Sequence, residues 1–205
     1  MSKNMKPTVF DNEQELLKAL ISLHCPEGIE LDPMYSKGNF YKEISNPILR
    51  FDINPQRDEC KYGDAKNLPL DNNSISNMIL DPPFMFGIHG KAEKYIMSTR
   101  FGIFKNFSEL ETLYKEILRE SHRLLKRNGV LIFKCQDYTD SKTTMVHCYV
   151  WKWALEQGFY AKDLAIFEFP KRIWNSNLKQ RHLRKTHSYF WVFIRKKAPK
   201  ITLNG

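Results

Sequence analysis

Four aspartates in the first half of the chain each stand at or just after the end of a predicted strand: Asp32, Asp52, Asp64 and Asp81. Three of these strands are short apolar runs, at residues 29–31, 48–51 and 77–80. The carboxyl ends of parallel strands meet at one edge of a sheet, where ligands of open α/β folds bind. Acidic residues scattered over a surface would not fall repeatedly at the ends of strands. The spacing therefore predicts a parallel sheet with an acidic, ligand-binding edge.

The stretch Asp81-Pro82-Pro83-Phe84 is expected to form a stiff end to its strand. Proline cannot donate to a sheet ladder, so the strand ends there, and each proline holds the residue before it extended. The stretch offers a carboxylate, carbonyl acceptors and a flat ring, which suits an exocyclic amine on a base. A tight turn after a strand is the alternative reading of Asp-Pro-Pro alone, just as Asp52 alone could cap a loop.

Strands and helices alternate along the chain, which favours a three-layer α/β sheet in one domain, residues 1–205. Helices are expected at residues 11–24, 108–127 and 142–157. Later strands are expected at residues 130–133, 164–169 and 189–194. No crossover helix separates the last two strands, so they are expected to be antiparallel.

Helix ends carry their own signals. Asp11 is expected to cap the first helix, and Ser108 is expected to cap the second with Glu111 completing a capping box. Asn128-Gly129 is expected to stop that second helix.

Two segments are expected to face a substrate. Residues 84–108 form a long insert rich in glycine and aromatic residues, and long loops in compact domains are often functional. Alternatively, its aromatic rings pack as a satellite cluster. The second segment, residues 170–187, is basic, and all 23 acids of the chain precede it although the net charge is +9. This uneven charge indicates a polyanionic partner, with phosphates held by Lys171, Arg172, Lys179, Arg181, Arg184 and Lys185.

The chain lacks the patterns of a membrane or secreted protein. No apolar run approaches the ~20 residues of a membrane span, and no apolar stretch follows the basic start as in a secretory signal. The four cysteines show no C-x-x-C pair or zinc-like cluster. A cytoplasmic protein with reduced thiols and no metal is expected, ending in a flexible tail at residues 196–205.

The order of motifs resembles a known family. Asp32-Pro33-Met34-Tyr35-Ser36-Lys37-Gly38, then Asp52, Gly63-Asp64 and Asp81-Pro82-Pro83-Phe84 are similar to S-adenosylmethionine-dependent amino-methyltransferases, which methylate N6 of adenine or N4 of cytosine, mostly in DNA. Residues 121–134 and the closing strand at 187–193 fit the same family, in a form typical of small phage and prophage enzymes. The resemblance spans roughly residues 10–195. It implies a Rossmann-like class I methyltransferase fold: a seven-stranded, mostly parallel sheet with an antiparallel last strand and helices on both faces.

The resemblance also implies roles. S-adenosylmethionine would be the cofactor, its methionine part held by Asp32 and by the turn that contains Tyr35, Ser36 and Gly38. Asp52 would bind the ribose hydroxyls and Asp64 the adenine amine. At the border with the cofactor, Asp81 and the Pro82 carbonyl would hold the target amine while Phe84 stacks on its base. Ser36 stands where the family usually has glycine.

The function expected from this resemblance is methyl transfer to an exocyclic amine of a DNA base, N6 of adenine ahead of N4 of cytosine. The alternatives are the same chemistry on ribosomal or transfer RNA, and a non-catalytic nucleic-acid-binding protein on the same fold. Carbon-5 methylation of cytosine is not expected, because it needs a nucleophilic Pro-Cys pair that the sequence lacks. Without a separate recognition domain, target recognition is expected to be short or loose unless a homodimer or a partner contributes.

Overall fold

The computed structural model of the protein describes residues 5–86, 104–139, 142–169, 181–183 and 185–196. Its centre is an eight-stranded sheet with strand order β1-β9-β10-β6-β5-β2-β3-β4. In that order the strands are Val9–Phe10, Phe159–Glu168, His187–Arg195, Leu125–Cys135, Ile75–Leu80, Leu31–Asp32, Leu49–Asp52 and Lys61–Tyr62.

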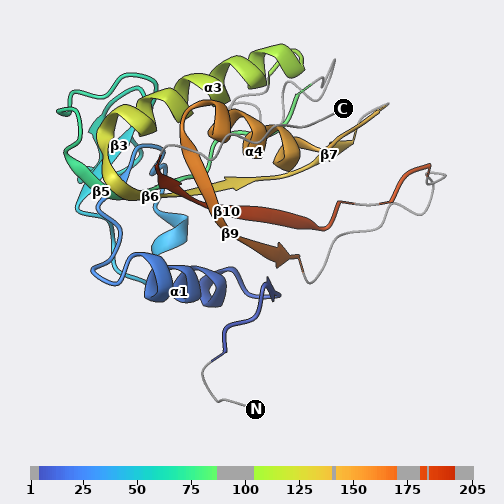
Figure 1. The fold of residues 1–205 in the computed structure, drawn as a ribbon, viewed down its shortest axis with the longest axis horizontal. Coiled ribbons are helices and arrows are strands. Elements are labelled where there is room, and N and C mark those ends of the chain that lie inside the picture. Colours follow the sequence, from blue (N-terminus) through green and yellow to red (C-terminus); the bar gives the residue numbers. More distant parts are fainter. Residues whose placement is uncertain (1–4, 87–103, 140–141, 170–180, 184, 197–205) are drawn as a thin grey trace.

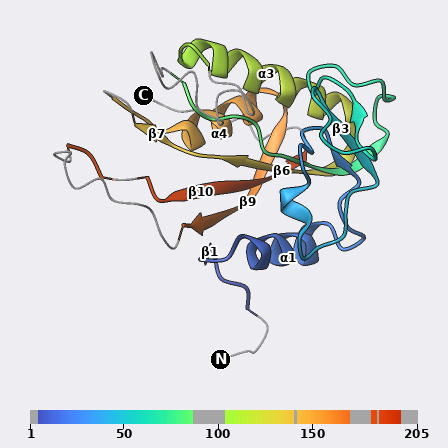
Figure 2. The ribbon, with the colours of Figure 1, turned by 180° about the vertical axis from the view of Figure 1, so that it is seen from behind.

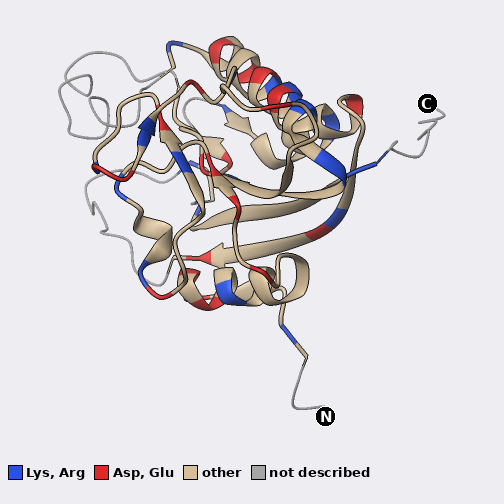
Figure 3. Ribbon diagram, turned by 90° about the vertical axis from the view of Figure 1, so that its left-hand side faces the viewer, with Lys and Arg blue, Asp and Glu red and all other residues tan. Residues whose placement is uncertain are grey.

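Helices cover both faces of this sheet, as Figures 1 and 2 show from opposite sides. α3 (Phe107–Leu124) and α4 (Val146–Glu156) lie on one face, and α1 (Glu13–His24) lies on the other. A short 3-10 helix, η1 (Asn39–Tyr41), packs on the α1 side, and β7 (Tyr138–Thr139) pairs with β8 (Thr143–Thr144) in a separate hairpin. Acidic and basic residues alternate along α3 in the side view of Figure 3.

The core explains why the central strands read as apolar runs. In β5, Met78 and Leu80 pack into the cluster beneath α3 and α4, while Ile79 packs into the cluster beneath α1. A strand of a parallel sheet is buried on both faces, so it needs apolar side chains at consecutive positions. No helix in the described part of the chain is long and apolar enough to cross a membrane.

Strand directions confirm the expected mostly parallel sheet. The ladders from β4 to β6 are all parallel. β10 runs antiparallel to both β6 and β9, as expected for the closing strand. The expected count of seven strands is wrong, because β1 adds an eighth, pairing parallel with β9 through Val9 and Phe10. A two-residue strand is too short to show a periodicity, and only its tertiary partner defines it.

Several helix boundaries differ from those expected. Asn12, rather than Asp11, caps α1, because its side chain accepts hydrogen bonds from the backbone of Gln14 and Glu15. The expected helix at 142–157 starts only at Val146, since Thr143–Thr144 is held in the β7–β8 hairpin.

The N-terminal cap of α3 lies two residues before the expected one. Asn106 accepts from the Glu109 backbone, and the Glu109 side chain accepts from the Lys105 backbone, so Ser108 and Glu111 do not form it. The helix then ends at Leu124, where β6 begins at once, rather than at residue 127. The prediction was wrong because Asn106 and Ser108 are both good caps, and the path of the chain into the helix decides between them.

Candidate active site

Three of the four aspartates meet at one edge of the sheet. β2 lies between β3 and β5, and both ladders are parallel: Leu31 pairs with Leu49 on one side and with Met78 on the other. Asp32 and Asp52 are the last residues of β2 and β3, and Asp81 directly follows β5. The sheet therefore places these carboxylates side by side at the carboxyl ends of adjacent strands, as the sequence predicted.

Asp32 is the most buried of them, with 4% of its surface exposed. One of its carboxylate oxygens accepts a hydrogen bond from the Tyr41 hydroxyl (2.7 Å), and the other accepts from the Met34 backbone (2.9 Å). Burial, together with the charges of Asp81 and Asp52, raises the pKa of Asp32 to about 7, while these two hydrogen bonds oppose the rise. A positive charge placed beside Asp32 would lower this pKa and favour the ionised carboxylate.

The turn after β2 links Asp32 to Asp52. The Ser36 backbone N–H donates to Asp52 at 2.8 Å, with Ser36 in the left-handed region at φ 50°. Gly38, at φ 70°, has no room for a side chain, because a Cβ would lie 2.5 Å from the Tyr35 hydroxyl. Ser36 thus takes the backbone conformation that glycine adopts most easily, at a cost of roughly 1 kcal/mol.

Asp52 and Asp64 lie further along the same edge. Asp52 accepts hydrogen bonds from two backbone groups, those of Ser36 and Asn54, each at 2.8 Å. Asp64 lies two residues beyond β4, where it accepts from the Lys66 backbone (3.0 Å) and approaches the Lys66 ammonium (3.4 Å). Hydrogen bonds from these backbone N–H groups hold both carboxylates in fixed positions.

Asp81 has a cationic partner that the sequence analysis missed. The Lys134 ammonium lies 3.2 Å from Asp81 and 2.9 Å from Glu13, and it also sits over the Phe40 ring at 4.8 Å. Burial raises the pKa of the Asp81 carboxyl, the charge of Lys134 opposes that rise, and the charge of Glu13 adds to it. The pairing follows from the ladder in which Leu80 lies opposite Phe133, so the next residue of each strand meets the other. The sequence signal that could have indicated this partner is a lysine directly after the apolar run at residues 130–133.

The residues after Asp81 present a carbonyl and a ring. Pro82 is buried and Phe84 is partly exposed. The Tyr114 hydroxyl donates to the Pro83 carbonyl at 3.1 Å. Among the described residues, no donor to the Pro82 carbonyl is seen, and this carbonyl directly follows Asp81 in the chain.

A second polar cluster, which the sequence analysis also missed, stands at the same edge beyond β6. The buried Asp137 accepts from the His147 ring at 2.7 Å and from the Tyr189 hydroxyl at 3.3 Å. Burial would raise the pKa of Asp137, but the hydrogen bonds from His147 outweigh it and hold that pKa below its usual range. Tyr189 also bonds to His187 at 2.7 Å and so belongs to this polar cluster, whereas the next residue, Phe190, is fully buried in the core.

The insert and the basic segment are described only in part. Phe86 bridges to Phe104, and its ring contacts Phe107 and Tyr138. These aromatic residues at the ends of the insert join the main core beneath α3 and α4, rather than a separate satellite cluster. Residues 87–103 of the insert lie outside the described residues, as do Lys171, Arg172, Lys179 and Arg184. Of the expected phosphate-binding residues, the structure describes Arg181, which is exposed, and Lys185, which is half-buried.

Fold and edge together define a class. An α/β sheet closed by an antiparallel strand between two neighbours, with carboxylates at the ends of its parallel strands, is a class I methyltransferase fold. Solved structures share it: TrmN from Thermus thermophilus (18% identity, TM-score 0.53, 89% of this chain and 48% of that one) and the MccD protein (12%, 0.52, 89% and 97%). PvuII DNA methyltransferase, cytosine-N4-specific, aligns at 15% identity and a TM-score of 0.50 over 68% of this chain and 50% of that one.

The chain belongs to the N6/N4 DNA methylase family, whose model matches residues 75–204. No curated protein matches it. The chain spans about half the length of PvuII methyltransferase and of TrmN. Methyltransferases of this family use S-adenosylmethionine.

The chemistry of the acidic edge fits this cofactor. S-adenosylmethionine carries a sulfonium and an ammonium, and the edge offers three carboxyl groups, those of Asp32, Asp52 and Asp81. The turn also brings the Ser36 backbone N–H within hydrogen-bonding distance of Asp52 at that edge. Among the described residues, no group of His, Cys, Asp or Glu is placed to hold a metal ion.

Proposed function

We propose that this protein transfers a methyl group from S-adenosylmethionine to the exocyclic amine of a base in DNA, N6 of adenine ahead of N4 of cytosine. The observation that carries the proposal is the position of Asp81. Its carboxylate stands next to the acidic edge formed by Asp32 and Asp52, and it is followed in the chain by Pro82 and the partly exposed Phe84. Membership of the N6/N4 DNA methylase family supports the same chemistry.

The acidic edge would hold the cofactor. In the proposal, Asp32 and the turn of Tyr35, Ser36 and Gly38 bind the methionine part, Asp52 the ribose hydroxyls, and Asp64 the adenine amine. S-adenosylmethionine, when bound, supplies a methyl group on a sulfonium that is already a good leaving group. The positive charge of the cofactor would favour the ionised form of Asp32, whose pKa is raised to about 7.

Asp81 and Pro82 would act on the target amine. An aromatic amine is a poor nucleophile because its lone pair is delocalised into the ring. Two acceptors, the Asp81 carboxylate and the Pro82 carbonyl, would draw its hydrogens toward a tetrahedral arrangement and localise that lone pair. The amine must also lose one proton on methylation, and the Asp81 carboxylate is placed to take it. Fixed acceptors keep the nitrogen oriented for transfer.

The nucleic acid would bind through the basic segment, with its base turned out of the stack onto Phe84. Replacing Arg181 and Lys185 together with Lys179 and Arg184 should weaken DNA binding and flatten its salt dependence, because fewer counterions are then released. Fluorescence anisotropy at several salt concentrations measures this. Unchanged affinity at low salt would show that phosphates bind elsewhere.

A labelling experiment tests the proposal. Protein and methyl-labelled S-adenosylmethionine are incubated separately with plasmid DNA, total RNA and free nucleosides, and the products are digested to identify the methylated base. Label on N6 of adenine in DNA is expected. Label on RNA alone would mean that the substrate of the same reaction is RNA rather than DNA. Calorimetry with the cofactor covers the non-catalytic alternative: no label together with no heat of binding would overturn the proposal.

A further inference from the structure

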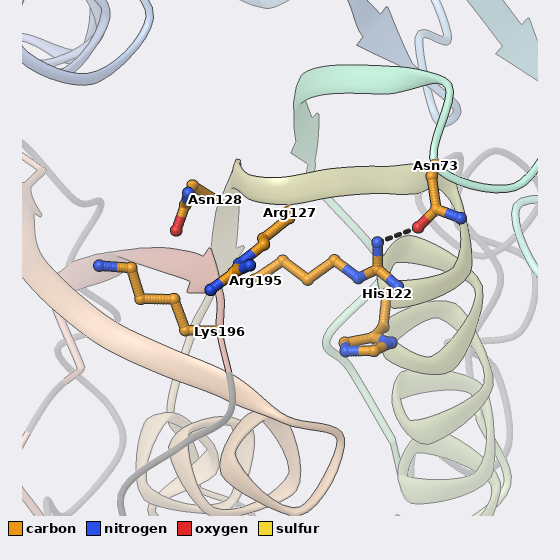
Figure 4. A pocket seen from close by; sticks show the side chains of 6 residues that line it. All are labelled: Asn73, His122, Arg127, Asn128, Arg195 and Lys196. Carbon is orange, nitrogen blue, oxygen red and sulfur yellow. Dashed lines mark hydrogen bonds between the residues drawn. The ribbon is translucent and has the colours of Figure 1, made fainter.

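The opposite end of the sheet contains a pocket that the proposed function does not use. It has a volume of about 770 Å³ and lies where β6 begins, β10 ends and α3 reaches its last turn. Six side chains line it, from those elements and the neighbouring turns, as Figure 4 shows: Asn73, His122, Arg127, Asn128, Arg195 and Lys196.

This lining is cationic. Three of the six side chains carry a full positive charge, a fourth is an imidazole, and the remaining two are amides. No acid is among them, and neither Arg127 nor Lys196 forms an ion pair with any residue that the structure describes. Burial lowers the pKa of His122, and the charge of Arg195 lowers it further, which reflects the same positive surroundings. The pocket therefore has unneutralised charge to offer an anion.

Hydrogen bonds hold the pocket in shape. The Arg195 guanidinium donates to the Asn73 side chain and to the Leu125 carbonyl, and the Asn73 backbone donates to the Arg123 carbonyl at 3.0 Å. Gly158, at φ 90°, leaves space beside the His122 ring, where a Cβ would lie 3.2 Å from Nε2. The arginine is thus oriented before any ligand arrives, which lowers the entropic cost of binding.

The pocket is far from the candidate active site. β6 runs from Leu125, at the pocket end, to Cys135, at the end beside Asp81. β5 covers the same stretch of the sheet from Ile75, opposite Leu125, to Leu80, opposite Phe133, so at about 3.3 Å per residue the two ends lie roughly 17 Å apart. A ligand in the pocket would leave the acidic edge free, and one nucleic acid would need several nucleotides to span both.

We propose that this pocket binds a phosphate-bearing anion. Guanidinium groups present paired donors that match phosphate oxygens, and a lysine ammonium adds a mobile charge. The volume lies within the range of small-molecule pockets and exceeds that of a single phosphate. Two sources share this chemistry, the backbone of a nucleic acid and a free nucleotide, and the experiment separates them.

The test compares two variants with equal loss of charge. Arg127→Gln/Lys196→Gln removes the two cations that form no ion pair with a described residue but keeps Arg195, whose hydrogen bonds hold the pocket in shape. Arg119→Gln/Lys162→Gln is the control, because both of its residues are exposed and lie outside the lining. Binding of pyrophosphate, AMP, a single-stranded 12-mer and a 30-base-pair duplex is measured on the full chain, with thermal melting to verify folding.

The proposal expects the pocket variant to bind at least one of these probes tenfold or more weakly than the wild type and the control. Loss confined to the two DNAs identifies a nucleic-acid backbone, and loss for AMP and pyrophosphate identifies a free phosphate compound. Equal loss in both variants, or no loss in either, overturns the proposal. A second readout is the NMR spectrum of the wild type, in which a bound ligand should shift the ring resonances of His122. Pyrophosphate should cause this shift if the ligand is a free phosphate compound, and the duplex should cause it if the ligand is a nucleic-acid backbone. Unmoved resonances with both also overturn it.

Discussion

At the scale of single residues, Asp32 shows that ionising a buried carboxyl at the acidic edge is unfavourable. It is buried, it lies near two further carboxylates, and its pKa is raised to about 7. A buried carboxylate surrounded by others is costly, and the folded protein reduces the cost by holding a proton there. Such arrangements concentrate at functional sites because a cationic ligand relieves them.

Replacing Asp32 with asparagine should change how stability depends on pH. The unfolded carboxyl has a pKa of ~3.9, so between about pH 4 and pH 7 the folded state holds a proton that the unfolded state has lost. The stability that this proton contributes is present below pH 4 and is lost as pH rises toward 7, at up to ~1.4 kcal/mol per pH unit. Asp32→Asn should remove this loss. Urea unfolding of both proteins at pH 5 and pH 8, without cofactor, measures it, and an identical pH dependence would contradict the account.

Lys134 and Glu13 should tune Asp81 in opposite directions. The charge of Lys134 lowers the pKa of Asp81, and the charge of Glu13 raises it. Lys134→Met should therefore move the acidic limb of the methyl-transfer rate to higher pH, and Glu13→Gln should move it to lower pH. Single-turnover rates across a pH series provide the measurement. Two shifts of the same sign would mean that Asp81 does not set that limb.

At the scale of elements, the cap of α3 separates two sequence signals that look equivalent. Asn106→Ala should destabilise the protein by about 1 kcal/mol, because the Glu109 backbone N–H loses its acceptor. Ser108→Ala is the matched control and should change the free energy of unfolding by only a few tenths of a kcal/mol. Denaturant unfolding measures both. A larger effect at Ser108 than at Asn106 would restore the capping box expected from sequence.

The acidic edge could be predicted from sequence because two local signals agree there. An apolar run predicts a buried strand, and an aspartate at the end of that run is expected at the carboxyl edge of the sheet. These two signals were enough to predict the positions of Asp32, Asp52 and Asp81. The pairing of Lys134 with Asp81 could not be predicted in the same way. It depends on the register between β5 and β6, which local sequence signals do not reveal. The Asp137–His147 contact likewise depends on the β7–β8 hairpin, which returns the chain between them.

At the scale of the whole molecule, the two ends of the sheet differ in charge. The carboxyl ends of the parallel strands gather aspartates that suit a cationic cofactor, while the opposite end holds a pocket lined by Arg127, Arg195 and Lys196. One long central strand, β6, joins them. The sheet thus separates a candidate site for a sulfonium from a candidate site for a phosphate.

The most direct test of the central claim is methyl transfer by Asp81→Asn, measured together with the affinity for S-adenosylmethionine. Asparagine keeps the size of the side chain but cannot take the proton or accept as strongly. The rate should fall by about 10²-fold or more, with cofactor affinity changed only a few-fold. Asp71→Asn, at an exposed acid in the preceding loop, should leave both unchanged. A near-normal rate for Asp81→Asn, with the cofactor bound, would contradict the account.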